Sequence, residues 1–315
     1  MMPTVLISGG TGLVGTNLTR HLLERKYKVI ILTRENGIIS NNPNISYHHW
    51  DVKNQLMDGG VLDKVDHIIH LAGAGVMDKK WTDEYKKEII NSRTNSAALI
   101  INTLKNNVHQ VKSFISASAI GYYGEDAPIL LLRREGFIET DLPSQGFLSE
   151  TCVMWEASTE PVKEFGIRLV KLRSGIVLAN SGGAFKEFKS PLKFGLATIF
   201  GDGKQIMSWI HIDDLCRMFC EAIENIYVEG VYNAVSPEPV SQKSFMIVLA
   251  EKMRKKFYSS LYIPQFLLKL FLGKRSIEIL KSATVSCKKI KATGFTFLYP
   301  TLDAALNELL QPKKN

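Results

Sequence analysis

Cysteine is scarce in this 315-residue chain, which has only four. The four form no Cys-x-x-Cys pair, and His211 ahead of Cys216 completes no standard zinc spacing. The pattern therefore excludes a disulfide framework, and we expect no metal site. A chain of this length can bury a large core without such links. Reduced thiols of this kind favour a cytoplasmic protein.

Long apolar runs are also missing. The longest apolar stretch near the C-terminus, residues 261–272, is interrupted by Pro264, Gln265 and Lys269 and is too short to span a bilayer. At the other end, the first three residues lead directly into a strand-like run, without a basic segment or a small-residue cleavage site. We therefore expect neither a membrane span nor a signal peptide.

No stripe of basic residues alternates with aromatic ones, although 39 Lys and Arg against 31 Asp and Glu give a formal net charge of +8. Such a charge attracts phosphates in general, but this pattern does not predict nucleic-acid binding. The basic cluster at 252–256 is interpreted as a solvated helix face. The apolar stretch 266–272 contains Lys269 and precedes Lys274 and Arg275. It is compatible with docking to a partner or an anionic membrane surface; the simpler interpretation is packing on the substrate side of its own chain.

Short apolar runs alternate with amphipathic stretches of helical length in the first half of the chain. This alternation predicts an α/β fold with a doubly wound parallel sheet of the Rossmann type. Candidate strands are residues 4–8, 28–33, 67–71, 113–116, 168–172 and 231–235, and residues 17–25 are the first candidate helix. From Gly175 the pattern loosens into loops and shorter elements. We therefore expect one domain over residues 1–175, to which residues 211–236 return, and a smaller α+β C-terminal domain over 176–315.

A glycine-rich turn follows the first candidate strand. Its pattern is Gly-x-x-Gly-x-x-Gly, and a side chain at these positions would keep the backbone N–H groups and the helix N-terminus away from a pyrophosphate. Between a strand and a helix the pattern predicts a dinucleotide site; the alternative is a tight turn that binds nothing. The turn residues expected at the cofactor are Gly9, Thr11, Gly12, Leu13, Val14 and Gly15.

The end of the second candidate strand, Leu32-Thr33-Arg34, bears on which cofactor binds. An acidic residue there would bind a ribose 2′-hydroxyl, whereas a basic one accommodates a 2′-phosphate. Arg34, with Thr33 beside it, therefore favours NADP(H), since a guanidinium makes paired hydrogen bonds to phosphate. Glu35 counts against this choice, and a surface arginine without a ligand is the alternative.

Several further motifs stand in order along the chain. They are Asp51-Val52, His70-Leu71-Ala72-Gly73, Ser92-Arg93, the run Ser-Ala-Ser-Ala-Ile-Gly-Tyr-Tyr-Gly at 116–124, Leu-Arg-Ser-Gly-Ile-Val-Leu at 172–178 and Ser-Trp-Ile-His-Ile-Asp-Asp-Leu at 208–215. With these motifs the chain resembles the extended short-chain dehydrogenase/reductases, and within them the branch of YfcH-like epimerase family proteins. The resemblance covers essentially the whole chain. Thr293-Gly294-Phe295 and Tyr299-Pro300 are similar to the small C-terminal domain of that branch.

The resemblance implies an NADP(H)-binding Rossmann domain and a mainly substrate-side C-terminal domain. It also implies further cofactor contacts: Asp51 and Val52 at the adenine, Leu71, Ala72 and Gly73 along the ribose and phosphates, and Glu88, Arg93 and Val177 lining the cofactor. The alternatives are plain packing for Leu71 and Val177 and paired helix charges for Glu88 and Arg93.

One departure from the family concerns catalysis. Short-chain dehydrogenases use a serine and a Tyr-x-x-x-Lys pair, in which the lysine lowers the tyrosine pKa. Alignment places Leu148 at the tyrosine and Cys152 at the lysine, and no tyrosine of this chain has a lysine four positions later. Ser118 remains at the place of the catalytic serine. Tyr122 or Tyr123 is a candidate proton donor, with packing or substrate stacking as the alternative.

Two functions remain open on the sequence. The first is an NADP(H)-dependent oxidoreductase or epimerase acting on a small carbonyl or sugar-like substrate. Met207 and Ser208 stand where sugar-nucleotide epimerases carry an Arg-Asp pair, which weakens the sugar-nucleotide interpretation. The second is a non-catalytic NADP(H)-binding or redox-sensing protein. A homodimer formed between helices is ordinary for such a sheet and is kept as an expectation.

Overall fold

The computed structural model describes residues 2–126 and 136–311, and the chain divides into two compact units. The first unit comprises residues 1–122, 143–173 and 216–232, and the second comprises residues 123–142, 174–215 and 233–315. Neither unit is therefore continuous in sequence. The functional roles predicted for 1–175 and 176–315 stay predictions.

An eight-stranded sheet is built mainly from the first unit, in the order β12-β7-β6-β5-β1-β2-β3-β4. Its strands are β1 (Thr4–Ser8), β2 (Lys28–Thr33), β3 (Ile45–Asp51), β4 (Leu56–Met57), β5 (His67–His70), β6 (Ser113–Ala119), β7 (Arg168–Ser174) and β12 (Gly230–Ala234). Strands β6, β5, β1, β2 and β3 pair in parallel, and β4 is antiparallel to β3. Continuous buried runs such as Val5-Leu6-Ile7 are typical of parallel strands that are covered on both faces.

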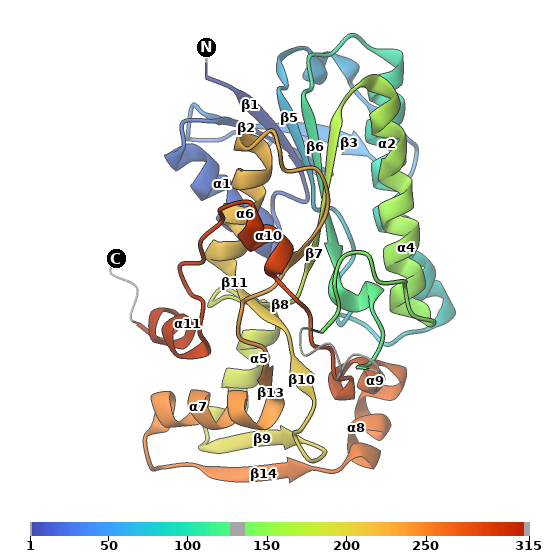
Figure 1. Ribbon diagram of the computed structural model, residues 1–315. Helices are drawn as coiled ribbons and strands as arrows, with labels where there is room; N and C mark the ends of the chain where they lie inside the picture. The colour runs from blue at the N-terminus through green and yellow to red at the C-terminus, as the bar shows by residue number, and fades with distance from the viewer. Residues whose placement is uncertain (1, 127–135, 312–315) are drawn as a thin grey trace. The chain divides into compact units, whose positions relative to one another are not determined.

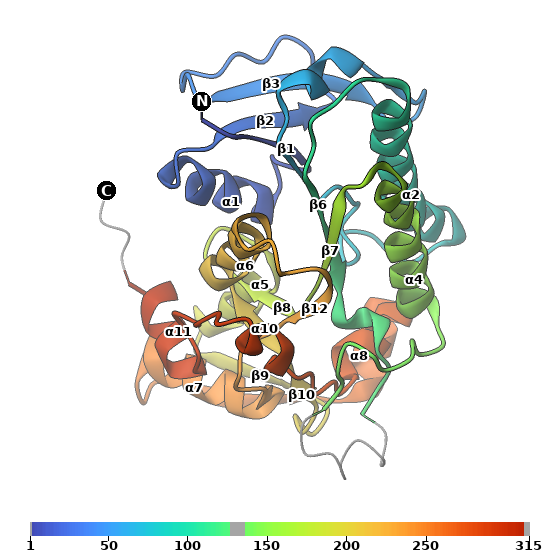
Figure 2. The same cartoon turned by 45° about the horizontal axis from the view of Figure 1, so that its top comes forward.

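Helices cover this sheet on both faces (Figure 1 and Figure 2). Helix α1 (Leu13–Glu24) lies on one face together with α6 (Ile212–Glu224), and Arg25 Nε at the end of α1 lies 3.4 Å from Glu224 Oε1. Helices α2 (Asp83–Asn106) and α4 (Phe147–Thr159) lie side by side on the other face. Short 3-10 turns are η1 (Gly59–Lys64), η2 (Ile120–Tyr122) and η3 (Glu160–Phe165). The predicted doubly wound Rossmann-type sheet is thus present.

Helix α2 shows why these residues fold as they do. The Thr82 side chain accepts a hydrogen bond from the Tyr85 N–H, and Asp83 and Glu84 place negative charge in the first turn. Its buried face packs into the core of the first unit. Core residues shared by the helices and strands include Leu6, Ile30, Ile68, Ile100, Leu104, Phe114 and Leu169. Full burial of each such side chain stabilises the fold by about 1.5–3 kcal/mol.

In its described residues, the second unit has three small two-stranded sheets and its own core. Its strands are β8 (Ile176–Leu178), β9 (Leu196–Phe200), β10 (Ile206–Met207), β11 (Trp209–His211), β13 (Val240–Ser241) and β14 (Ser259–Ile263). Its helices are α5 (Gly183–Leu192), α7 (Gln242–Arg254), α8 (Gln265–Leu272), α9 (Ser276–Leu280), α10 (Lys288–Ala292) and α11 (Leu302–Leu309), with the 3-10 turn η4 (Gly273–Arg275). Trp209, Phe185, Phe245 and Leu306 lie in its core. This unit has the smaller α+β character that the sequence predicts.

Candidate functional site

Parallel strands of the first unit end side by side. Ser8, the last residue of β1, is in register with Leu32 in β2 and with His70 in β5. Doubly wound sheets bind ligands outside the carboxyl ends of their strands. This edge is therefore the candidate site, and most of the residues predicted at the cofactor lie at the ends of β2 and β3 or in the segments that follow β1, β2, β3 and β5.

Close backbone contacts explain the glycines after β1. Gly9 has a φ of +73°, and a Cβ at this residue would lie 2.8 Å from the carbonyl carbon of Leu71. A Cβ at Gly15 would lie 2.4 Å from the Gly9 carbonyl oxygen. Only glycine permits these approaches, which bring the turn, the end of β5 and the first turn of α1 together.

The N-terminus of α1 lacks a capping side chain because its N-cap residue is Gly12. The N–H groups of a first helical turn have no partner inside the helix, and together with the helix dipole they suit an anion. Thr11 is exposed in the turn, and Leu13 and Val14 are half-buried in the first turn of α1. The structure therefore brings the six predicted turn residues together at one helix N-terminus.

The ends of β2 and β3 carry the next group of predicted residues. Thr33 is buried at the end of β2, and Arg34 directly after it is exposed. Asp51 ends β3 and accepts hydrogen bonds from the Asn54 N–H at 3.0 Å and from Asn54 Nδ2 at 2.7 Å. These bonds hold the pKa of Asp51 below its usual value, so the carboxylate stays charged. Val52 packs against the core.

The segment after β5 lies against a buried arginine. Leu71 and Ala72 are half-buried, and Gly73 is exposed. A Cβ at Gly73 would lie 2.9 Å from Cζ of Arg93, which is only 8% exposed. Arg93 Nη1 donates hydrogen bonds to the carbonyl oxygens of Ala74 and Ile89, and its guanidinium lies 4.8 Å from the ring centre of Trp155. Arg93 thus fixes the backbone at the end of β5.

Two predicted lining residues do not belong to the segments that directly follow these strands. Glu88 on α2 is exposed, and its Oε2 lies 3.5 Å from Nζ of Lys79. Val177 belongs to β8 of the second unit, where it is half-buried and in register with Ile210. Their roles at a cofactor stay predictions.

A buried hydrogen-bonded triad includes the end of β6. Ser118 Oγ donates a hydrogen bond to Glu156 Oε1 at 2.7 Å. Arg173 donates from Nε to Glu156 Oε1 at 2.7 Å and from Nη2 to Oε2 at 2.8 Å. The three residues come from β6, α4 and β7, and each is less than a tenth exposed. A buried carboxylate is tolerated here because a forked guanidinium neutralises it.

The two tyrosines after Ser118 differ in their surroundings. Tyr122 is half-buried, and the Arg173 guanidinium lies 3.4 Å from its ring centre. Tyr123 is fully buried, stacks on Phe137 and donates a hydrogen bond from its hydroxyl to Asn233 Oδ1 at 2.8 Å. The position of Tyr123 suits packing, so Tyr122 is the better-placed proton donor of the two.

The positions that align with the tyrosine and lysine pair hold apolar groups. Leu148 and Cys152 stand one turn apart on α4, and a Cβ at Gly121 would lie 3.5 Å from Leu148 Cβ and 3.7 Å from Cys152 Sγ. Burial raises the pKa of the Cys152 thiol to about 12, although Arg93 opposes the shift. Cys152 is therefore a neutral thiol at physiological pH and cannot act as a charged partner for a phenol.

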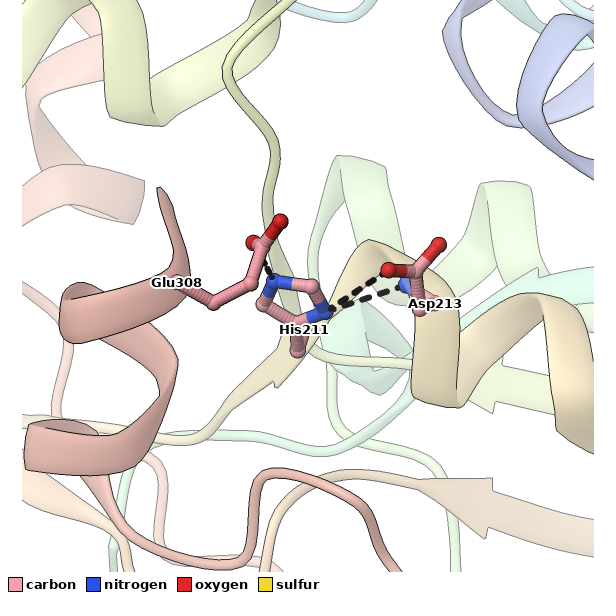
Figure 3. Close-up of side chains that lie close together, drawn as sticks. All are labelled: His211, Asp213 and Glu308. Carbon is pink, nitrogen blue, oxygen red and sulfur yellow. Dashed lines mark hydrogen bonds and ion pairs between the residues drawn. The ribbon is translucent and has the colours of Figure 1, made fainter. Parts of the chain in front are cut away.

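A separate cluster of three side chains lies in the second unit (Figure 3). The Asp213 N–H donates to Nδ1 of His211 at 3.1 Å, so Nδ1 must be unprotonated. The proton then sits on Nε2, which donates to Glu308 Oε2 at 2.8 Å. Both ring nitrogens of this buried histidine have partners here, and the arrangement ties α11 to the start of α6.

Sequence reasoning missed Glu156 and Arg173. Their signal is a charged residue inside an otherwise apolar element: Arg173 stands in the buried strand Arg-Leu-Val-Lys-Leu-Arg-Ser, and Glu156 follows Trp155 on α4. Buried charges need partners. The sequence shows that partners must exist but does not identify them.

Residues 5–234 match the model of the NAD dependent epimerase/dehydratase family, and residues 263–309 match a domain of unknown function named DUF1731. An epimerase family protein of Staphylococcus saprophyticus is 35% identical over 309 residues, which are 98% of this chain and 100% of that protein.

Two solved structures are similar to the whole chain. A human epimerase family protein, solved with NADPH, has a TM-score of 0.83 and 26% identity, and the match covers 97% of this chain and 98% of that one. A nucleoside-diphosphate sugar epimerase of Corynebacterium glutamicum has a TM-score of 0.76 and 29% identity, covering 98% of this chain and 58% of that one.

Proposed function

Because this chain belongs to the NAD dependent epimerase/dehydratase family, we propose that it binds NADP(H) at the carboxyl edge of its parallel sheet and acts as an oxidoreductase or epimerase on a small carbonyl or sugar-like substrate. The observation that carries the proposal is the glycine turn, where close backbone contacts present an uncapped helix N-terminus. The human relative solved with NADPH supports the same cofactor.

The residues present fit a dinucleotide. Gly9, Thr11, Gly12, Leu13, Val14 and Gly15 would hold the pyrophosphate, and Leu71, Ala72 and Gly73 would lie along the ribose. Asp51 keeps a charged carboxylate and Val52 an apolar surface for the adenine. Arg34 is exposed at the end of β2 and would pair with a 2′-phosphate. Glu88, Arg93 and Val177 complete the proposed set.

A bound nicotinamide supplies or accepts a hydride, and Ser118 would polarise the substrate carbonyl. The Ser118 hydroxyl donates to Glu156, so it must turn from that carboxylate before it can donate to a substrate. Arg173 lowers the cost of this hydroxyl rotation, because its two hydrogen bonds still neutralise the Glu156 carboxylate when Ser118 has turned away. Tyr122, whose ring is fixed under Arg173, is the candidate proton donor.

A second candidate function rests on Leu148 and Cys152. With an apolar side chain and a neutral thiol at the tyrosine and lysine positions, the chain lacks the usual proton relay of its family. A non-catalytic NADP(H) sensor needs no relay. It does need different affinities for NADP and NADPH, because only differential binding shifts a conformational equilibrium.

Turnover separates the two candidates. We expect NADPH oxidation, followed by absorbance, with at least one member of a panel of small carbonyls and sugar-like compounds. Ser118→Ala is expected to lower kcat by about 100-fold, the scale of one lost oxyanion donor, with unchanged NADPH affinity. No turnover across the panel, together with different affinities for NADP and NADPH, would favour the sensor.

A further inference from the structure

One segment of the second unit exposes large apolar side chains. Over residues 252–281 the exposed ones are Phe257, Leu261, Tyr262, Phe266, Leu270, Phe271 and Ile277. Phe257, Leu270 and Phe271 are each more than 70% exposed. Scattered single apolar residues are normal on a surface, whereas large apolar side chains that share one exposed helix face indicate an interaction surface.

The backbone explains why these side chains face outward. Among the described residues, strand β14 pairs only with β9, and four of its five residues are exposed. It leads directly into α8 (Figure 1). On α8, Leu268 is buried, whereas Phe266, Lys269 and Leu270 are exposed at the i, i+3 and i+4 spacing of one helix face. The outward face of α8 is therefore apolar with a lysine in it.

The same segment holds almost all the net charge of the chain. Residues 252–281 contain eight Lys or Arg and one Glu, a formal charge of +7. Of the 39 basic and 31 acidic residues, the rest of the chain then has 31 and 30, a charge of +1. Lys281 lies 3.5 Å from Glu278 and Lys252 pairs with Asp303 of α11, and counting Asp303 still leaves +6.

We propose that the 252–281 segment docks this protein on an anionic membrane surface. An anionic bilayer offers a partner to each kind of side chain in the segment. Its anionic headgroups attract the cations, and the apolar layer below them accommodates Phe266, Leu270 and Phe271. A second copy of this chain is a poorer partner for the segment, because a formal charge of +7 would face the same charge of +7. The segment lies on the surface rather than crossing it: in the described part of the chain, no helix is long and apolar enough to span a bilayer.

Vesicle sedimentation tests the proposal with the full-length protein. We expect binding to phosphatidylcholine vesicles with about 30% phosphatidylglycerol to be at least tenfold stronger than to phosphatidylcholine alone, and to weaken in about 0.5 M salt. The apolar variant is Leu270→Ser/Phe271→Ser, and its matched control is Ile39→Ser/Val108→Ser, two residues 89% exposed in the first unit. The charge variant is Lys269→Glu/Lys274→Glu, with Lys87→Glu/Lys105→Glu on α2 as control.

Both segment variants are expected to lose at least tenfold in binding to anionic vesicles, while both controls bind like the wild type. Circular dichroism confirms that each variant is folded. The proposal is overturned if anionic vesicles are not bound, if neutral vesicles are bound equally well, or if the segment variants match their controls. Light scattering covers the other occupant: a concentration-dependent dimer that Leu270→Ser/Phe271→Ser abolishes, without vesicle binding, assigns the segment to a second copy.

Discussion

At the scale of single residues, two glycines of the turn are expected to have different roles, Gly15 in the stability of the fold and Gly12 in cofactor binding. A Cβ at Gly15 would lie 2.4 Å from one backbone atom and 2.5 Å from another, whereas a Cβ at Gly12 meets only the Gly9 oxygen at 3.3 Å. Gly15→Ala is therefore expected to destabilise the fold by about 1–3 kcal/mol. Gly12→Ala is expected to change stability by less than about 1 kcal/mol but to weaken NADPH binding about tenfold, since the added methyl group would stand where we propose that the pyrophosphate binds.

Urea unfolding and NADPH fluorescence measure the two effects separately. Wild-type affinity in Gly12→Ala would contradict the placement of the pyrophosphate, and wild-type stability in Gly15→Ala would contradict the backbone contact.

The Glu156–Arg173 pair gives a second prediction. Glu156→Leu leaves the Arg173 guanidinium buried without its carboxylate, and we expect a loss of about 3–5 kcal/mol of unfolding free energy. The double variant Glu156→Leu/Arg173→Met removes both charges and should recover most of that loss. Ser118→Ala, the milder control, removes one hydrogen bond and should cost about 1 kcal/mol. Thermal or urea unfolding of the three variants tests the pair, and a double variant no more stable than Glu156→Leu would argue against it.

These residues also show what a sequence discloses at this scale. The glycine turn is predictable because its spacing and its place between a strand and a helix are local. The partner of Arg173 is not, because Glu156 lies 17 residues earlier on another element and meets it only when α4 packs on the sheet. Ser118 was identified as a candidate, but its hydrogen bond to Glu156 appears only in the folded chain.

At the scale of elements, β5 should make stability depend on pH. His70 is fully buried, with Nδ1 2.7 Å from Ser8 Oγ, and burial lowers its pKa to about 4. Burial also lowers the pKa of His67 to about 4. These histidines become protonated below about pH 6.5 in the unfolded chain, but only near pH 4 in the folded chain. Stability therefore falls as pH falls through this interval, and it is unaffected by them above pH 6.5.

We expect His70 alone to cost about 2 kcal/mol between pH 7.5 and pH 5, at about 1.4 kcal/mol for each pH unit below 6.5. Urea unfolding at the two pH values measures this loss, and His70→Asn should reduce it. An equal loss in wild type and His70→Asn would show that His70 does not carry the effect.

The presence of most helices and strands is predictable from the sequence, but the residues at which they begin and end are less so. The first two strands were predicted at 4–8 and 28–33, where β1 and β2 lie. The first helix was predicted at 17–25 but spans Leu13–Glu24, because it begins directly after its N-cap Gly12 and includes Gly15, a glycine that the close backbone contact with the turn requires. The apolar stretch 266–272 does form helix α8, but its exposed face could not be read from the sequence, since burial is decided by tertiary packing.

At the scale of the whole molecule, cofactor binding should stabilise the fold. A ligand that binds only the native state at 100 times its Kd adds about 2.7 kcal/mol to the free energy of unfolding. We expect NADPH to raise the Tm of the wild type and to have a much smaller effect on Gly12→Ala at the same concentration. Scanning calorimetry measures both, and an equal shift in the two proteins would mean that NADPH binds elsewhere.

The fold class and family were predictable at this scale because ordered motifs run along the whole chain. The division into units was harder to predict: Tyr123 belongs to the second unit although it directly follows η2 of the first. Tertiary packing, which the local sequence does not specify, determines the unit to which each of two neighbouring residues belongs.

Direct titration of NADPH and NADH, followed by the fluorescence of the four tryptophans, tests whether the protein binds NADP(H) selectively. We expect saturable NADPH binding about tenfold tighter than NADH binding, with the preference lost in Arg34→Ala, because Arg34 would hold the 2′-phosphate. Binding of neither cofactor, or equal binding of both, would contradict this expectation.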